Sequence, residues 1–393
     1  MAHAFVLNCG SSSIKSAIID TQTGQRMIEI LAERLGQPNS DLVFKYQGQK
    51  YQQRVASGSY ADTFNQIYQF LLEHHLLDQL VVVGHRVVHG GCDFNQPALI
   101  DQDVMHLIEK NRPLAPLHNG ANKAGIEFCQ KLLPELPQIA VFDTAFHQSM
   151  PKTSYQYAID QTLAQDYQIR KYGFHGTSHQ YITQTFSQRH GIDYPNIIVA
   201  HLGNGCSVTA VKDGQSYDTS MGFTPLDGLV MGTRSGTIDP GVFGYVAQQL
   251  GWDSQKMTTV LNKESGLLGL CGDNDMRDIE ARVEKGDAAA SDALALFCQR
   301  IASYVASYWR YYERFDGLVF TGGIGENSPV VRQQVIQALL NLGLALDQSA
   351  NDAMIKQPAG LINANGSPRI DVIPTDEENM IAQLSIKLVK SVE

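Results

Sequence analysis

The chain has 393 residues, which is too long for one compact core, so its length predicts two domains. Its hydrophobic content of 43% and charged content of 18% are ordinary for a globular protein and exclude a largely disordered chain. A formal net charge of −10, with no run rich in lysine and arginine, argues against nucleic-acid binding. The six cysteines are scattered and no segment is apolar enough to cross a bilayer, so we expect a cytoplasmic protein with reduced thiols and no membrane partner.

Short apolar strands alternate with helices along the chain. Phe5–Leu7 and Ser16–Ile19 are predicted strands on either side of a turn, and apolar residues at helical spacing run from Tyr60 to Leu71. Further strands are predicted at 81–83, 138–142, 197–202 and 318–320, and further helices at 294–308 and 380–389. Strands that alternate with helices predict an α/β architecture.

One structural pattern occurs twice in the sequence. Residues 6–20, VLNCGSSSIKSAIID, are predicted to form a strand, a Gly/Ser turn, a second strand and an acidic turn. Residues 199–213, VAHLGNGCSVTAVKD, repeat that layout half a chain later. A repeat on this scale predicts two related domains; the alternative is a chance likeness between two unrelated hairpins.

Three glycine-rich turns each follow an apolar strand. They are Asn8–Ser13, with Lys15 in the next strand, His201–Gly205 and Gly322–Asn327, after which Ser328 is the expected N-cap of a helix. Glycine lets the backbone approach phosphate oxygens, so three such turns predict nucleotide binding, although each alone is compatible with ordinary turn chemistry. Neither a P-loop nor a dinucleotide fingerprint is complete, so neither is predicted.

Two arginines and one aspartate lie where a charged side chain needs a partner. Arg86 lies in an apolar, β-branched stretch and Arg234 lies between glycines, and a guanidinium in either place suits a carboxylate or phosphate. A salt bridge or a solvated side chain is the alternative for each arginine. Asp143 ends an apolar strand, where α/β proteins bind ligands, and a helix N-cap is its alternative.

Two further motifs leave alternatives open. His175 and His179 share an H-x₃-H spacing, but the glutamate of a zincin is absent, so zinc is not predicted and either a phosphate-facing or a structural role stays open for His175. The acidic turn at 374–379 contains Glu377, which could complete a magnesium site or cap the final helix.

The motifs VLNCGSSSIK, GHRVVHGG, PLAPLHN, VFDTAFH, RKYGFHGTSH, HLGNG, GFTPLDGLVMGTRSG, GGIGENS and PTDEE resemble those of the acetate kinase (acetokinase) family from the first strand to the last helix. The resemblance implies an α/β, duplicated two-domain actin-like ATPase fold of the acetate and sugar kinase/hsp70/actin superfamily. It implies an N-terminal domain of residues 1–147 completed by 378–393, a C-terminal nucleotide-binding domain of residues 148–377, and a homodimer.

The same resemblance implies roles for individual residues. Asn8 and Glu377 would bind Mg²⁺, for which Mn²⁺ could substitute, and Ser13 and Lys15 would support the phosphates of ATP or ADP. The expected catalytic residues are Asp143, His175 and Arg234. The expected substrate contacts are Arg86, which with Arg234 would hold the carboxylate and the phosphoryl group, and an acyl pocket of Val88, Leu117, Phe174 and Pro225. The expected nucleotide contacts are His201, Leu202, Gly203, Asn204, Gly205, Asp275, Met276, Arg277, Gly323, Ile324, Gly325, Glu326 and Asn327.

The implied activity is reversible transfer of the ATP γ-phosphate to acetate by direct in-line attack, with the arginines, His175 and Mg²⁺ neutralising charge as the domains close. Val88 matches an acetate preference, which we expect to be graded because one methylene changes binding by only about 1–3 kcal/mol. The alternatives are a propionate or short-chain acyl kinase, an actin-like ATP-dependent binding protein without kinase activity, and a sugar kinase, which would need a polar pocket.

Overall fold

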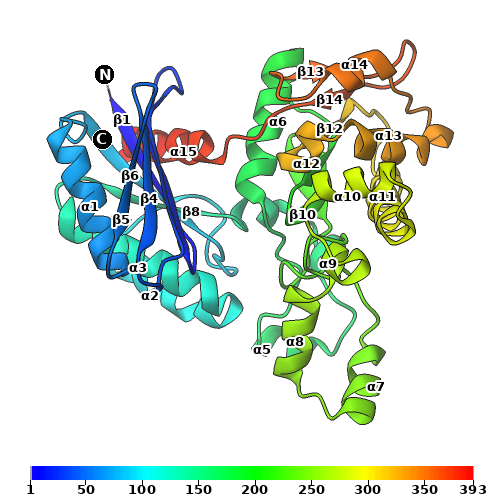
Figure 1. Cartoon of the computed structure of the whole chain (residues 1–393), viewed down its shortest axis with the longest axis horizontal. Helices are drawn as coiled ribbons and strands as arrows, with labels where there is room; N and C mark the ends of the chain where they lie inside the picture. The colour runs from blue at the N-terminus through cyan, green and yellow to red at the C-terminus, as the bar shows by residue number, and fades with distance from the viewer. Residues whose placement is uncertain (1, 393) are drawn as a thin grey trace. The chain divides into compact units, whose positions relative to one another are not determined.

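The computed structural model describes residues 2–392, apart from the side chains of Leu117 and Val392. The chain folds into two compact units, unit 1 (Met1–Phe146 with Asp376–Glu393) and unit 2 (His147–Thr375), and Figure 1 labels most of their helices and strands. We expected the divisions at 147/148 and 377/378. The divisions lie instead at 146/147 and 375/376, so that His147 belongs to unit 2. Asp376 and Glu377 belong to unit 1, where Glu377 begins the last helix and Asp376 pairs with Arg26 at 2.6 Å.

Unit 1 is built on one mixed sheet with helices on both faces. In spatial order its strands are β5 (Gln49–Val55), β4 (Ser40–Tyr46), β3 (Arg26–Glu33), β2 (Ser13–Asp20), β1 (His3–Cys9), β6 (Leu80–Val87), β8 (Gln138–Phe142) and β7 (Ala98–Leu99). Its helices are α1 (Tyr60–Glu73), α2 (Gln102–Lys110), α3 (Pro116–Leu132) and α15 (Glu377–Val392). Short 3-10 helices lie at Arg112–Leu114 and Ala145–Ser149.

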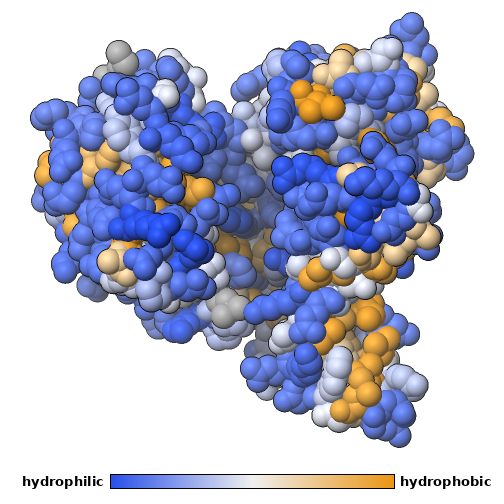
Figure 2. Space-filling model, in the orientation of Figure 1, coloured by the Kyte–Doolittle hydropathy of each residue, from blue (hydrophilic) through white to orange (hydrophobic). Residues whose placement is uncertain are grey.

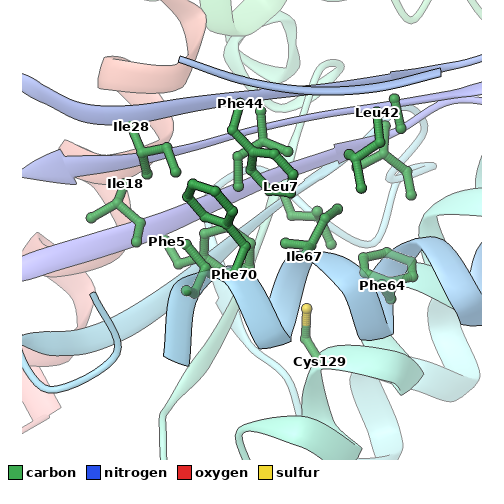
Figure 3. Close-up of a cluster of buried hydrophobic side chains, with 14 of the residues drawn as sticks. Phe5, Leu7, Ile18, Ile28, Leu42, Phe44, Phe64, Ile67, Phe70 and Cys129 are labelled. Atoms are coloured by element: carbon green, nitrogen blue, oxygen red, sulfur yellow. The ribbon is translucent and has the colours of Figure 1, made fainter. Parts of the chain in front are cut away.

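Strand β1 is buried on both faces, which explains the unbroken apolar run from Ala4 to Leu7 at its centre. Successive side chains of a strand point to opposite faces. Phe5 therefore packs with α1 residues such as Phe64, in the cluster that Figure 3 shows. Val6 packs instead with Ile381 of α15. Helix α15, from the end of the chain, thereby completes the core of the first unit and carries Glu377 at its first position.

Unit 2 repeats this plan. In spatial order its strands are β11 (Gln215–Thr219), β10 (Cys206–Lys212), β9 (Ile197–Leu202), β12 (Gly317–Thr321), β14 (Ile370–Val372) and β13 (Gly360–Leu361). Its helices are α4 (Lys152–Tyr155), α5 (Gln161–Asp166), α6 (Gly176–His190), α7 (Gly241–Leu250), α8 (Ser254–Lys263), α9 (Gly266–Cys271), α10 (Met276–Glu284), α11 (Ala288–Trp309), α12 (Gly322–Asn327), α13 (Pro329–Gln337) and α14 (Gln348–Ala353), with a 3-10 turn at Leu340–Leu342.

Five central strands of each sheet share one topology. In unit 1, β3, β2 and β1 are antiparallel neighbours, and β6 and β8 continue the sheet in parallel with β1. In unit 2, β11, β10 and β9 are antiparallel neighbours, and β12 and β14 continue in parallel with β9. The repeated sequence pattern lies in both cases in the central hairpin. The duplicated α/β fold predicted from that repeat is confirmed.

One predicted loop is a helix. Gly322–Asn327 forms α12, which starts directly after β12 with Gly322 at φ +77°. Its last carbonyls, those of Gly325 and Glu326, accept hydrogen bonds from the buried guanidinium of Arg332 at 2.9 and 3.0 Å, so the short helix is held at its end. The N-cap prediction is confirmed, because Ser328 Oγ accepts from the backbone N–H of Val331 at 3.0 Å and starts α13.

Candidate active site

The carboxyl ends of β6 and β8 carry an ion pair in unit 1. These strands are parallel neighbours, so Arg86 near the end of β6 and Asp143 just after β8 meet at one edge of the sheet. The Nε of Arg86 donates to Asp143 Oδ1 at 2.9 Å, and its Nη1 lies 3.3 Å from Asn8 Oδ1. Glu377 Oε2 lies 4.0 Å from Arg86 Nε. The structure thus brings together four residues predicted separately from the sequence.

The charged groups at this edge shift one another's pKa values. Burial opposes the positive charge of Arg86, but Asp143 and Glu377 outweigh it, so the pKa of Arg86 is raised. Burial raises the pKa of Glu377, and Arg86 opposes that rise. The neighbouring guanidinium favours the charged form of this carboxyl group, which is the form that binds a cation.

The donors at this edge fit a magnesium ion. Asn8 and Glu377 offer hard oxygen ligands, and Mg²⁺ binds through one or two carboxylates and keeps most of its waters. Within residues 2–392, no group of three or more His, Cys, Asp and Glu side chains could enclose a metal ion.

The β1–β2 turn adds two of the predicted phosphate-binding residues. The turn closes through a bond from the N–H of Gly10 to the carbonyl of Ser13 at 2.8 Å. Lys15 is exposed on β2 and pairs across the strands with Asn8. Its positive charge acts to lower the pKa of Glu377. Lys15 therefore lies near the same edge as the ion pair.

In unit 2, an arginine and a histidine meet at the β9–β10 turn. A Cβ built on Gly205 would lie 3.5 Å from both Arg234 Nη1 and His175 Nε2. His175 precedes α6 with φ +56°, a left-handed conformation that a non-glycine residue adopts rarely and often at functional sites.

Arg234 differs from Arg86 in its partners. Its Nη1 donates to the carbonyl of Pro225 at 3.2 Å, and among the described residues it forms no ion pair with a carboxylate. Burial lowers the pKa of Arg234. A partly buried guanidinium without an anion is costly, so this position is prepared for an anionic ligand.

A cavity of about 620 Å³ lies beside the same turn in unit 2. Its lining includes these predicted nucleotide contacts: Gly203, Asn204, Asp275, Met276, Arg277, Gly323, Ile324 and Asn327. It also includes residues that we did not predict, namely Asn274, Glu280, Ser328 and Lys356. Of these, only Ser328 stood in a motif we singled out, while Asn274 adjoins the predicted Asp275.

Some predicted nucleotide contacts do not line this cavity. Leu202 and Gly325 are buried in the unit. Glu326 directs Oε1 to the backbone N–H groups of Gly322 and Thr375, at 2.9 and 3.0 Å. The ring of His201 lies tilted against that of His175, with ring centres 4.4 Å apart. Direct contact of these residues with a nucleotide stays a prediction.

The predicted acyl pocket draws on both units, and each residue is described in its own unit. Val88 is buried and its N–H donates to Asn122 Oδ1 at 3.1 Å. Phe174 is buried, and Pro225 is half-buried beside Arg234. Leu117 lies in α3, and its side chain is outside the described part of the structure. That these residues form one pocket stays a prediction.

None of the helices in residues 2–392 has both the length and the apolar character needed to cross a membrane.

Comparison with known proteins gives matches over the whole chain. The profile described as "Acetokinase family" matches residues 3–383. The acetate kinase of Francisella tularensis subsp. holarctica is 49% identical over 390 residues, covering 99% of this chain and 100% of that protein. A solved structure described as a propionate kinase from Francisella tularensis subsp. tularensis is 49% identical, with a TM-score of 0.95, covering 98% of this chain and 100% of that one. The structure of Porphyromonas gingivalis acetate kinase is 36% identical, with a TM-score of 0.94, covering 99% and 100% of the two chains.

Proposed function

Since the chain belongs to the acetokinase family, we propose that it transfers the γ-phosphate of ATP to acetate, giving acetyl phosphate and ADP, and catalyses the reverse reaction. The observation that carries the proposal is Arg234, a partly buried guanidinium with no carboxylate partner among the described residues, placed beside His175. The cavity beside the same turn supports it, because its size and lining suit a nucleotide.

The chemistry needs positioning and charge neutralisation more than covalent catalysis. In unit 2, Arg234 and His175 would donate hydrogen bonds to the phosphoryl oxygens as charge develops on them. In unit 1, Arg86 would orient the attacking carboxylate, with its own guanidinium held in place by Asp143. The acetate oxygen attacks the γ-phosphorus in line, the bond to the β-phosphate oxygen breaks, and ADP leaves.

Magnesium fits the edge of unit 1. Asn8 and Glu377 would hold Mg²⁺, or Mn²⁺ in its place, and the ion when bound would neutralise phosphate charge. Lys15 and Ser13 would add donors from the neighbouring turn.

The preferred length of the acid substrate is a further part of the proposal. One relative is named an acetate kinase and a solved structure of equal identity is described as a propionate kinase. We propose acetate as the preferred substrate because Val88 is a medium-sized apolar residue. Values of kcat/KM for acetate, propionate and butyrate would settle this; a higher value for propionate would overturn the preference.

Trapping of the product tests the whole proposal. The protein is incubated with Mg-ATP and acetate, and hydroxylamine converts any acetyl phosphate to acetyl hydroxamate. We expect hydroxamate that depends on acetate. ATP hydrolysis without hydroxamate would favour a nucleotide-driven binding protein, and phosphorylation of an added sugar alone would favour a sugar kinase.

We also propose that the protein is a cytoplasmic homodimer. Helix α7 buries none of its residues, yet it exposes Phe243, Tyr245 and Leu250, and Figure 2 shows hydrophobic residues gathered over this region. A short helix gains most of its stability from packing its apolar face, and a second copy would supply that contact. Sedimentation velocity should show a dimer, and Tyr245→Asp should shift it towards monomer.

A further inference from the structure

We propose that Ser207 is a positioning residue that relays a hydrogen bond from His179 to His175 and so fixes which ring nitrogen of His175 carries the proton. The inference rests on the proposed catalytic role of His175 and adds two residues that this role does not include. All three side chains lie in unit 2.

The serine lies between two imidazole rings. Ser207, at the second position of β10, is fully buried. Its Oγ lies 3.0 Å from Nδ1 of His175 and 2.8 Å from Nε2 of His179. His179 follows His175 by one helical turn of α6, so both rings reach the same strand. A serine hydroxyl has one proton to donate, so it can donate to only one of the two rings.

The surroundings of His179 decide the direction. The ring is fully buried, and burial lowers its pKa well below the ordinary value, so it is neutral at pH 7. Its Nδ1 has no hydrogen-bond partner among the described residues. A buried N–H without a partner is rarer than a buried acceptor without one, so the proton of His179 belongs on Nε2. His179 then donates to Ser207 Oγ.

The direction of the first bond sets the second. Because Ser207 accepts from His179, its own hydroxyl proton is available to His175 Nδ1. A neutral His175 that accepts at Nδ1 carries its proton on Nε2. Nε2 is the nitrogen 3.5 Å from the Cβ position of Gly205, the point that Arg234 Nη1 also approaches at 3.5 Å. The relay therefore presents an N–H donor next to the guanidinium, as stabilisation of a phosphoryl oxygen requires.

Nitrogen-15 NMR of the histidine rings tests the tautomer in the unmodified protein. At neutral pH we expect His175 to carry its proton on Nε2 and to accept at Nδ1, and His179 to carry its proton on Nε2. A proton on Nδ1 of His175 would overturn the proposal. This measurement needs neither a variant nor turnover, so it stays informative if the proposed phosphoryl transfer fails.

Kinetics of Ser207→Ala give the second readout. The variant removes the hydroxyl that orients the imidazole of His175. We expect kcat to fall by about 10–100-fold while KM for ATP and KM for acetate each stay within twofold. The matched control is Ser216→Ala, which removes a comparably buried serine from Nδ1 of His147 at 2.8 Å and should keep kcat within about threefold.

The outcomes separate the two proposals. If the native protein forms acetyl hydroxamate and Ser207→Ala keeps its kcat and the Nε2 tautomer of His175, the relay is wrong and the proposed function stands. If the native protein forms no hydroxamate, the proposed function is wrong whatever the NMR shows. If Ser207→Ala does not fold, the tautomer of the native protein decides.

Discussion

Each unit holds one partly buried arginine near a turn of its central strands, but the two arginines have different surroundings. In unit 1, Arg86 is paired with Asp143 and lies near Glu377. In unit 2, Arg234 has no carboxylate partner among the described residues and lies beside His175. The two arginines also come from different elements, because Arg86 lies on β6 and Arg234 lies in the loop after β11. The surroundings of Arg86 suit a cation together with a carboxylate substrate, and those of Arg234 suit a phosphoryl group.

Removal of the unpaired guanidinium should have the largest effect on catalysis. For Arg234→Ala we expect kcat to fall by about 10²–10³-fold, because a donor to the transition state is lost, with little change in KM for ATP. The control is Arg310→Ala, which removes an exposed arginine of unit 2 that bonds Tyr311. An unchanged kcat in the Arg234 variant would refute its catalytic role.

The two arginine environments should also differ in stability. Asp143→Asn leaves Arg86 without its main partner, and we expect the free energy of unfolding to fall by about 3 kcal/mol, the lower end for a buried pair, since 21% of the Arg86 side chain is exposed. Arg234→Ala removes no ion pair, so the free energy of unfolding should change by about 1 kcal/mol or less. Urea denaturation measures both. Equal losses of unfolding free energy in the two variants would show that the two arginines do not differ in their ion pairing.

Local sequence patterns identified the charged residues of the candidate site but did not predict which of them contact one another. Arg86 was predicted to bind an anion or form a salt bridge, and Asp143 to lie at a ligand site or cap a helix; the structure pairs them with each other. That pairing depends on β6 and β8 being neighbours, which neither local pattern specifies. The role of Ser207 could not be predicted for the same reason, since only the register of β10 against α6 brings it between two histidines. Glycine-rich turns, by contrast, carry their signal in the local sequence.

The outer strands of unit 1 were missed for a different reason. β3 alternates buried residues such as Ile28 and Ile30 with partly exposed Met27 and Glu29. β5 is mostly exposed and polar, so its pattern resembles that of a loop. An edge strand of this kind is defined by its pairing with a neighbour more than by its own hydrophobicity. Likewise, α12 has a loop-like composition and is held as a helix by Arg332.

Buried neutral histidines should make the stability of the protein depend on pH. Burial lowers the pKa of His85 to about 4, although its Nε2 lies 2.7 Å from Gln138 Oε1. The unfolded chain has the ordinary value of about 6.5, so it takes up a proton that the folded protein excludes. The stability that the neutral His85 contributes is therefore fully present above about pH 6.5 and is lost as the pH falls towards 4.

The measurement is the free energy of unfolding at pH 7 and pH 5. His85→Gln should reduce the loss between these two values by up to about 2 kcal/mol. An exposed histidine provides the control, and His75→Gln should leave the loss unchanged. If the His85 variant loses as much stability as the native protein, the imidazole is not excluded from protonation in the fold.

The smallest expected effect concerns the size of the acid. If unit 1 contacts the acyl group through Val88, shortening that side chain makes room for one more methylene. Val88→Ala should then raise the ratio of kcat/KM for propionate to that for acetate by about tenfold. Val87→Ala is the matched control, because Val87 is equally apolar and packs in a separate core cluster with Phe142. If the two variants shift the ratio alike, the change comes from loosening the sheet, and the preference for acetate must then be set by other residues than Val88.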